Sequence, residues 1–234
     1  LLTSIIVIFG NLAFPLVTIL IYNTGSSFPN WNLWEVLLIQ SLFTLSTSFT
    51  SIFLGGTLWE TMNYVREGNF EIVLLKPINS LFYIVSSTFS IHNIGLLLSC
   101  LAIFIIALIN TGIYSLMSII WSLIIFTGGI CVMIGVYLIM AAISFKWVGN
   151  SRIPEIFGSI QSFGKYPLTI FPAILQGIVT FILPVGMIAF YPAAALLGRV
   201  DLKIIIAIVP CILFMLFGIW LYRHMIRLYE GVGG

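Results

Sequence analysis

The residues from Arg66 to Ser80 read REGNFEIVLLKPINS and form the most charged short stretch of a chain that is otherwise almost entirely apolar. Long apolar runs lie on both sides of it, and within it stand a glycine, a proline and a sequence typical of a helix start. A polar, turn-forming segment between two long apolar runs is typical of a loop that joins two membrane spans. We call this stretch the elbow, and the interpretation of the whole sequence starts from it.

The composition of the chain indicates its class. Hydrophobic residues make up 61% of the 234 residues and charged residues only 7%, with a mean hydropathy of +1.20. Soluble domains carry about 25% charged residues, so a soluble fold of this size could not cover its surface. The apolar runs are long enough for membrane helices and show no strand-like alternation. The sequence therefore predicts an all-α integral membrane protein, and its net charge of +2 gives no reason to expect a nucleic-acid partner.

Six apolar runs are predicted to cross the membrane as one transmembrane domain. They are residues 1–22, 33–64, 81–110, 116–145, 168–191 and 202–225. The second run exceeds one bilayer thickness by about ten residues, so it must tilt, kink near Gly55-Gly56 or project from the membrane. Prolines interrupt the fifth run, which predicts a broken span, or a span followed by a short re-entrant piece at residues 192–197.

The distribution of Lys and Arg predicts the orientation, because cytoplasmic loops are enriched in both. These residues gather in the elbow, in residues 146–166 and in the tail, and they are absent from residues 23–32 and 111–115. Only Arg199 and Lys203 fall on the other side. We therefore expect both termini and the elbow in the cytoplasm of a multi-pass plasma-membrane protein. Residues 152–165 carry apolar side chains at helical spacing, which predicts an amphipathic helix on the membrane surface.

Catalytic chemistry is nearly absent from the sequence. Two His and few carboxylates cannot build a metal cluster, and the three Cys stand singly in apolar runs. His92 is the only ionisable residue well inside a predicted span and is a functional candidate on that ground, although a neutral His bonded to a neighbouring helix is more common. The segment GSIQSFGK at residues 158–165 has five residues between its glycines and Tyr166 after the lysine, so it fails as a phosphate-binding loop. No bound cofactor is expected in this chain.

The elbow is predicted to hold a short amphipathic helix. Asn69 is placed to cap it and Glu71 lies in its first turn, where the helix dipole favours an acid. One side carries Phe70, Val73, Leu74 and Pro77, with Arg66, Glu67 and Lys76 around it. A solvated loop would not need three apolar side chains, so we expect Phe70, Val73 and Leu74 to contact a protein or lipid.

Several segments together resemble one family. The R-x-G-x-F-E-x-x-L-L-K-P pattern of the elbow is followed by YPLTIFP at residues 166–172, LPV at 183–185, YPAAALLG at 191–198 and RLYEGVGG at 227–234. In this order they are similar to permease subunits of the type-two ATP-binding-cassette exporters, in the six-span bacterial and archaeal branch. The likeness covers most of the chain from about Trp31 onward.

The resemblance implies a fold and a mechanism. It implies a coupling helix at Asn69–Lys76 that sits in a groove of a separate ATPase, with these coupling residues: Arg66, Asn69, Phe70, Glu71, Val73, Leu74, Lys76 and Pro77. It implies a re-entrant hairpin or gate after the fifth span, with Tyr191, Pro192, Leu196 and Gly198. Two permeases, the same or related, would pack with two ATPases that hold ATP and Mg²⁺, and spans one, two and five would line the path. The family also carries an amphipathic helix before the first span, which we expect to precede residue 1.

Two questions stay open at the level of sequence. Glu60 and Arg66 fall where the family often carries charged groups, but no separate role is assigned to either. Few polar groups in the spans favour an apolar or amphipathic substrate. The alternative is a stand-alone secondary transporter or channel, which would need ionisable residues at mid-membrane depth, where His92 alone qualifies. Lipid is the expected surrounding partner in either case.

Overall fold

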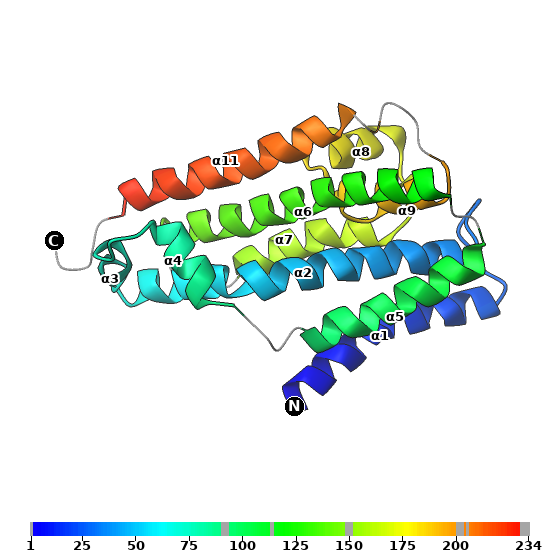
Figure 1. Ribbon diagram of the computed structural model, residues 1–234, viewed down its shortest axis with the longest axis horizontal. Helices are drawn as coiled ribbons and strands as arrows, with labels where there is room; N and C mark the ends of the chain where they lie inside the picture. The colour runs from blue at the N-terminus through cyan, green and yellow to red at the C-terminus, as the bar shows by residue number, and fades with distance from the viewer. Residues whose placement is uncertain are drawn as a thin grey trace.

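The computed structural model describes residues 2–89, 94–112, 115–147, 152–199, 204 and 206–229, with residues 2–12 described as backbone only. Every regular element in these ranges is helical, which confirms the predicted all-α class for them. The long helices lie roughly along one axis of the molecule (Figure 1). We call the end that carries the elbow the elbow end, and the end where the second helix begins the far end.

The first two helices form as the apolar runs predict. Helix α1 spans Leu2–Asn23 and α2 spans Leu33–Arg66. A capping box starts α2, because the Asn32 side chain accepts from the Glu35 backbone and the Glu35 carboxylate accepts from the Asn32 backbone. Helix α2 has 34 residues, hence a length of about 51 Å, and it continues unbroken through Gly55 and Gly56.

Gly56 allows α2 to pack closely against Thr88. A Cβ added there would lie 2.4 Å from the Thr88 Cβ, so only glycine allows this approach. Thr88 follows α4 (Ser80–Ser87), and α5 (Ile94–Thr111) comes next. The run predicted at 81–110 is therefore not one continuous helix. The hydroxyls of Ser86, Ser87 and Thr88 bond to carbonyls of the preceding turn, a pattern that competes with the helical ladder.

The tightest helix pair joins α6 (Leu116–Ser144) and α11 (Ile208–Arg227). A Cβ added at Gly218 would lie 2.8 Å from the Gly135 carbonyl oxygen, and one added at Gly135 would lie 3.0 Å from the Phe214 carbonyl oxygen. Small residues at such positions let membrane helices approach backbone to backbone. Helix α6 agrees with the predicted run 116–145. Helix α11 begins later than the predicted run 202–225, whose residues 202 and 203 lie outside the described part.

The region predicted as the fifth span is a series of short elements. These are η3 (Leu168–Ile170), α8 (Ala173–Gly177), η4 (Ile178–Ile182), η5 (Val185–Ile188) and α9 (Phe190–Leu196). The helix is interrupted here as the sequence predicts, and the position of this region in the membrane stays a prediction. Pro167, Pro172 and Pro184 cause the interruption, because each lacks the N–H that a continuous helix needs.

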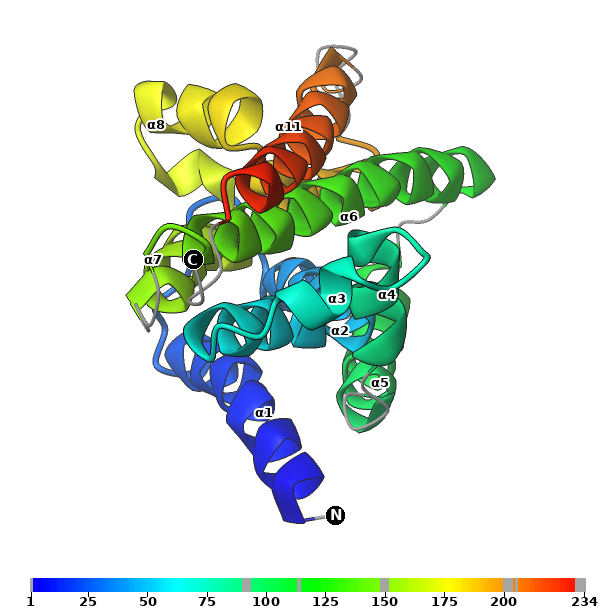
Figure 2. The same cartoon turned by 90° about the vertical axis from the view of Figure 1, so that its left-hand side faces the viewer.

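The predicted amphipathic helix is present. Helix α7 spans Arg152–Ser162 and continues into η2 (Phe163–Lys165). Its Phe157 and Ile160 line a small cavity with Val132 and Val136 of α6. Helix α7 therefore packs along the bundle, beside α6 (Figures 1 and 2), and its location at the membrane surface stays a prediction.

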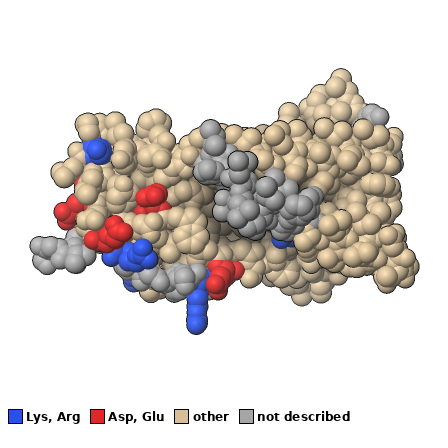
Figure 3. All heavy atoms as spheres, turned by 90° about the horizontal axis from the view of Figure 1, so that it is seen from below, with Lys and Arg blue, Asp and Glu red and all other residues tan. Residues whose placement is uncertain are grey.

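Four of the described helices are long and apolar enough to cross a membrane. They are Leu33–Arg66, Ile94–Thr111, Leu116–Ser144 and Ile208–Arg227. Ala173–Ile182 is a shorter apolar helix, and the part of α1 whose side chains are described, Ala13–Asn23, is apolar as well. On the face seen in Figure 3, most of the visible acidic and basic atoms gather toward the elbow end, and much of the rest is uncharged.

Candidate functional site

The elbow begins with a tight reversal of the chain after α2. Gly68 has a positive φ of 71°, and its N–H donates to the Val65 carbonyl while the Asn69 N–H donates to the Tyr64 carbonyl. This pair of bonds is a Schellman motif, which closes a helix C-terminus at glycine. Asn69 therefore takes part in ending α2. Its predicted role as the cap of the next helix is wrong, since Phe70 occupies that position without a side-chain cap bond.

The short helix of the elbow is α3 (Glu71–Leu74), and its apolar side is turned inward. Phe70 and Val73 are completely buried, so the expectation that they form an outward contact is wrong. The Phe70 ring packs edge-on against Phe145 at 4.8 Å between centroids and against Tyr229 at 5.5 Å. These rings come from the ends of α6 and α11. Because the elbow also follows α2 directly in the chain, it is attached to three long helices.

The outer side of the elbow carries a different apolar set. The side chains of Ile72, Leu74 and Leu75 are 52%, 42% and 84% exposed. Leu74 was expected to face outward and does so; Ile72 and Leu75 were not singled out by the sequence. A one-turn helix presents its residues on all sides, so only the burial of Phe70 and Val73 reveals which side is free.

Charged and polar groups surround this exposed set. Glu71, Lys76 and Pro77 are exposed, and the Lys76 ammonium lies 5.6 Å from the Tyr83 ring centroid. Arg66 is exposed and donates to the Asn63 side chain at 3.3 Å. Glu60 is half-buried on α2, one and a half turns before Arg66. The outer surface of the elbow is thus an apolar patch with charges at its edge, a composition typical of a protein contact.

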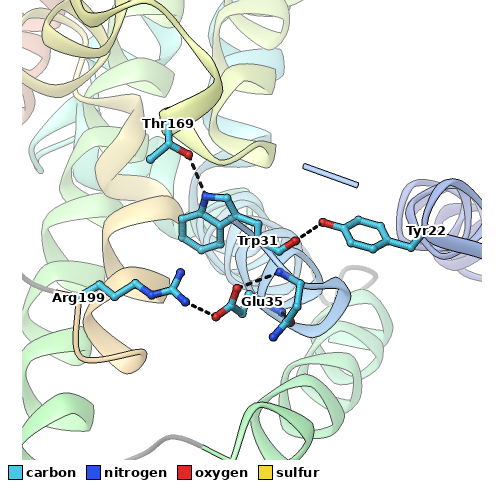
Figure 4. A network of polar contacts seen from close by, with 6 residues as sticks. Tyr22, Trp31, Glu35, Thr169 and Arg199 are labelled. Atoms are coloured by element: carbon cyan, nitrogen blue, oxygen red, sulfur yellow. Dashed lines mark hydrogen bonds and ion pairs between the residues drawn. The ribbon is translucent and has the colours of Figure 1, made fainter. Parts of the chain in front are cut away.

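The far end holds a polar network that joins four segments of the chain (Figure 4). The Arg199 guanidinium forms an ion pair with the buried Glu35 carboxylate and lies 5.0 Å from the Trp31 ring centroid. The Trp31 indole N–H donates to the Thr169 hydroxyl at 2.8 Å, and the Tyr22 hydroxyl donates to the Trp31 carbonyl at 2.8 Å. The network joins the end of α1 and the start of α2 to η3 and to the segment after α9.

The residues predicted for a re-entrant gate lie next to this network. Pro192 and Leu196 of α9 are buried, Tyr191 is half-buried, and Gly198 ends the element with a positive φ of 70°. The Tyr191 hydroxyl lies 2.8 Å from the Thr180 hydroxyl. The structure brings these four residues together beside Arg199; a gating role stays a prediction.

Removal of the guanidinium at Arg199 should destabilise the far end. Arg199→Gln leaves the buried Glu35 carboxylate without its cation, and we expect a loss of about 1–3 kcal/mol of unfolding free energy. Thermal unfolding of the purified protein in detergent measures it. The matched control is Arg66→Gln, which removes an exposed cation outside any ion pair among the described residues. Equal melting temperatures of the two variants would contradict the role given to the network.

Lys165 is a functional candidate that the sequence did not single out. The sequence counted it among the cations of residues 146–166, and in the structure its ammonium lies 5.1 Å from the Phe14 ring centroid and 5.3 Å from that of Phe43. Phe14 is in α1 and Phe43 in α2, so the cation lies between these helices. The helical spacing of residues 152–165 could have suggested this position, because a helix with one polar side can also lie inside a membrane protein next to other polar groups.

The remaining candidates contribute little. His92 lies outside the described residues. Within the part that the structure describes, no group of three His, Cys, Asp or Glu side chains could hold a metal ion. Cys100, Cys131 and Cys211 are free thiols.

These features define a helical membrane protein whose elbow exposes an apolar patch at one end of the bundle. Comparison with family models agrees: residues 5–233 match the family described as ABC-2 family transporter protein. The chain therefore belongs to the ABC-2 transporter family, as the elbow and the later segments indicated. Searches of curated proteins and of solved structures found no match.

Proposed function

We propose that this chain is the transmembrane permease subunit of an ATP-driven exporter that moves an apolar or amphipathic substrate. Two such subunits, the same or related, would work with two separate ATPase subunits that bind ATP and Mg²⁺. Family membership supports a role in membrane transport. Coupling to an ATPase is supported by the exposed apolar patch on the elbow, which is anchored to the bundle by buried side chains. The direction of transport rests on the resemblance.

The proposed topology has six crossings of the plasma membrane with both termini and the elbow in the cytoplasm. We place the first and second crossings at α1 and α2, and the third at α4 and α5 together. The fourth is α6, the fifth is α7 with η2 and η3, and the sixth is α11. Two observations support this count. Phe70, Phe145 and Tyr229 bring the ends of α2, α6 and α11 together at the elbow, and Tyr166 near the end of η2 packs against Phe28 of the far-end loop at 6.2 Å. Residues 173–196 would then form the outer re-entrant element.

The elbow is proposed to dock on the ATPase through Ile72, Leu74 and Leu75, with Glu71 and Lys76 at the edge. Docking at this patch lets motion of the ATPase pass into the bundle, because the Phe70 ring links the elbow to the ends of α6 and α11. A stand-alone transporter would have no use for such a patch, which is costly to expose to water.

The double variant Ile72→Asp/Leu75→Asp tests this proposal. Both side chains are exposed, so the fold should survive while the docking patch acquires two charges. We expect the affinity for a co-expressed ATPase subunit to fall by about 100-fold or more, so that co-purification and transport are both lost. The control is Ile72→Met/Leu75→Met, which keeps the patch apolar. Unchanged association of the aspartate variant would rule out docking through this surface.

A further inference from the structure

Lys165 holds a positive charge in the apolar part of the bundle. Phe14 lies nine residues before the end of α1, and Phe43 lies ten residues after the start of α2. At 1.5 Å per residue, the ammonium is about 13–15 Å from the far end and more than about 30 Å from the elbow end of α2. This depth lies within or close to the hydrocarbon layer, which is about 30 Å thick.

Among the described residues, no carboxylate lies within ion-pair distance of the Lys165 ammonium. Glu35 is paired with Arg199, two turns beyond Phe43 along α2, and Glu155 stands about 15 Å from Lys165 along α7. The neighbours that face the ammonium are aromatic rings. Rings attract a cation through their π faces but leave its charge available to an anion.

The position of Lys165 between α1 and α2 also leaves it accessible. Its side chain is half-buried, and the backbone beneath it is fixed by close packing: a Cβ added at Gly164 would lie 3.1 Å from the Phe43 ring. Tyr166 packs against Phe14 at 5.5 Å between ring centroids. The ammonium is therefore held in place by its surroundings. An ionisable group held at membrane depth is costly and is normally retained for function.

We propose that Lys165 and the rings of Phe14 and Phe43 form a binding site for an amphipathic molecule with an anionic head group. The ammonium would contact the head group and the two rings its apolar chain. The assignment of this molecule as the transported substrate rests on the proposed function, and it narrows the substrate class from apolar or amphipathic to anionic and amphipathic.

Photo-crosslinking with two matched compounds tests the site. The full-length protein is placed in nanodiscs of phosphatidylcholine and exposed to a diazirine-bearing alkyl sulfate or to the corresponding alkyl alcohol, and labelled peptides are quantified by mass spectrometry. We expect the sulfate to label the peptides around Phe14 and Phe43 in preference to the alcohol. Lys165→Gln should reduce that labelling about tenfold, since a charge-assisted contact is lost, and Lys165→Arg should retain most of it.

Three controls sharpen the result. Labelling of the exposed α11 side chains Ile212 and Leu216 reports general partition into lipid and should be equal for both compounds and all variants. Lys76→Gln removes an exposed cation at the elbow and should change nothing at the site. The elbow variant Ile72→Asp/Leu75→Asp should bind normally, so failure of docking and failure of this site give different results.

Equal labelling by sulfate and alcohol would overturn the inference, and so would unchanged labelling in Lys165→Gln, because either result shows that the charge recognises no anion. Loss of sulfate labelling when the nanodiscs contain phosphatidylglycerol would support the anion site. It would overturn its assignment to the transported molecule, because a resident membrane lipid then occupies it.

Discussion

Replacement of Phe70 by alanine should loosen the elbow from the bundle and destabilise the protein by about 3–5 kcal/mol. Phe70 is completely buried, and its ring contacts Phe145 and Tyr229 edge-on. The substitution removes the ring from both contacts and leaves a cavity where α3 meets α6 and α11. Unfolding in detergent, followed by circular dichroism against denaturant, measures the loss.

The same variant distinguishes anchoring from docking. Phe70→Ala leaves Ile72, Leu74 and Leu75 in the sequence, so the ATPase should still associate when stability permits, while transport per ATP hydrolysed should fall because the linkage is loose. The conservative variant Phe70→Leu should recover most of the stability. A stability of Phe70→Ala equal to that of the unmodified protein would show that the rings do not anchor the elbow.

Replacement of Gly129 by valine should disrupt the contact between α6 and η5. A Cβ at Gly129 would lie 2.4 Å from the Met187 carbonyl oxygen and 2.8 Å from the Ile188 Cα. Both are backbone atoms that cannot rotate away, so α6 and η5 must separate. The hydrogen bond from the Ser46 hydroxyl to the Ile188 carbonyl, 3.0 Å long in the unmodified protein, is then lost. We expect a loss of about 3 kcal/mol, at the upper end of overpacking effects, measured as the change in unfolding midpoint.

Gly158→Val is the matched control, because a Cβ there has nothing within 4 Å and the residue is exposed on α7. Valine is a better helix former than glycine, so its effect should be neutral or slightly stabilising. Similar losses at both positions would mean that glycine matters for the helix as such and that the close approach to η5 is not the cause.

The sequence predicts the long helices well because their signal is local. Hydropathy alone locates α1, α2 and α6 within two residues of the predicted ends, and the capping box at Asn32 and Glu35 agrees with the start of α2. The break between α4 and α5 is missed, because an apolar run hides the hydroxyl side chains that bond back to the preceding turn.

Tertiary contacts decide what the sequence could not. The helical spacing of α7 does not show which helix it packs against, and only the contacts of Phe157 and Ile160 place it beside α6. Likewise, Phe70 and Val73 are correctly grouped on one side of the elbow, but that side is buried by rings of Phe145 and Tyr229, which lie at least 75 residues away along the chain. A pattern shows that a surface is apolar and does not show what covers it.

The aromatic contacts of the elbow have a mechanical consequence. Rings from the ends of α6 and α11 surround Phe70, and Phe145 also contacts Tyr222 at 5.6 Å, while Gly135 and Gly218 hold the two helices together farther along. A displacement of α3 therefore moves the closely packed pair α6 and α11 as well as α2. Bending of a single helix would account for little of this displacement. The bundle should respond by rotating as a block.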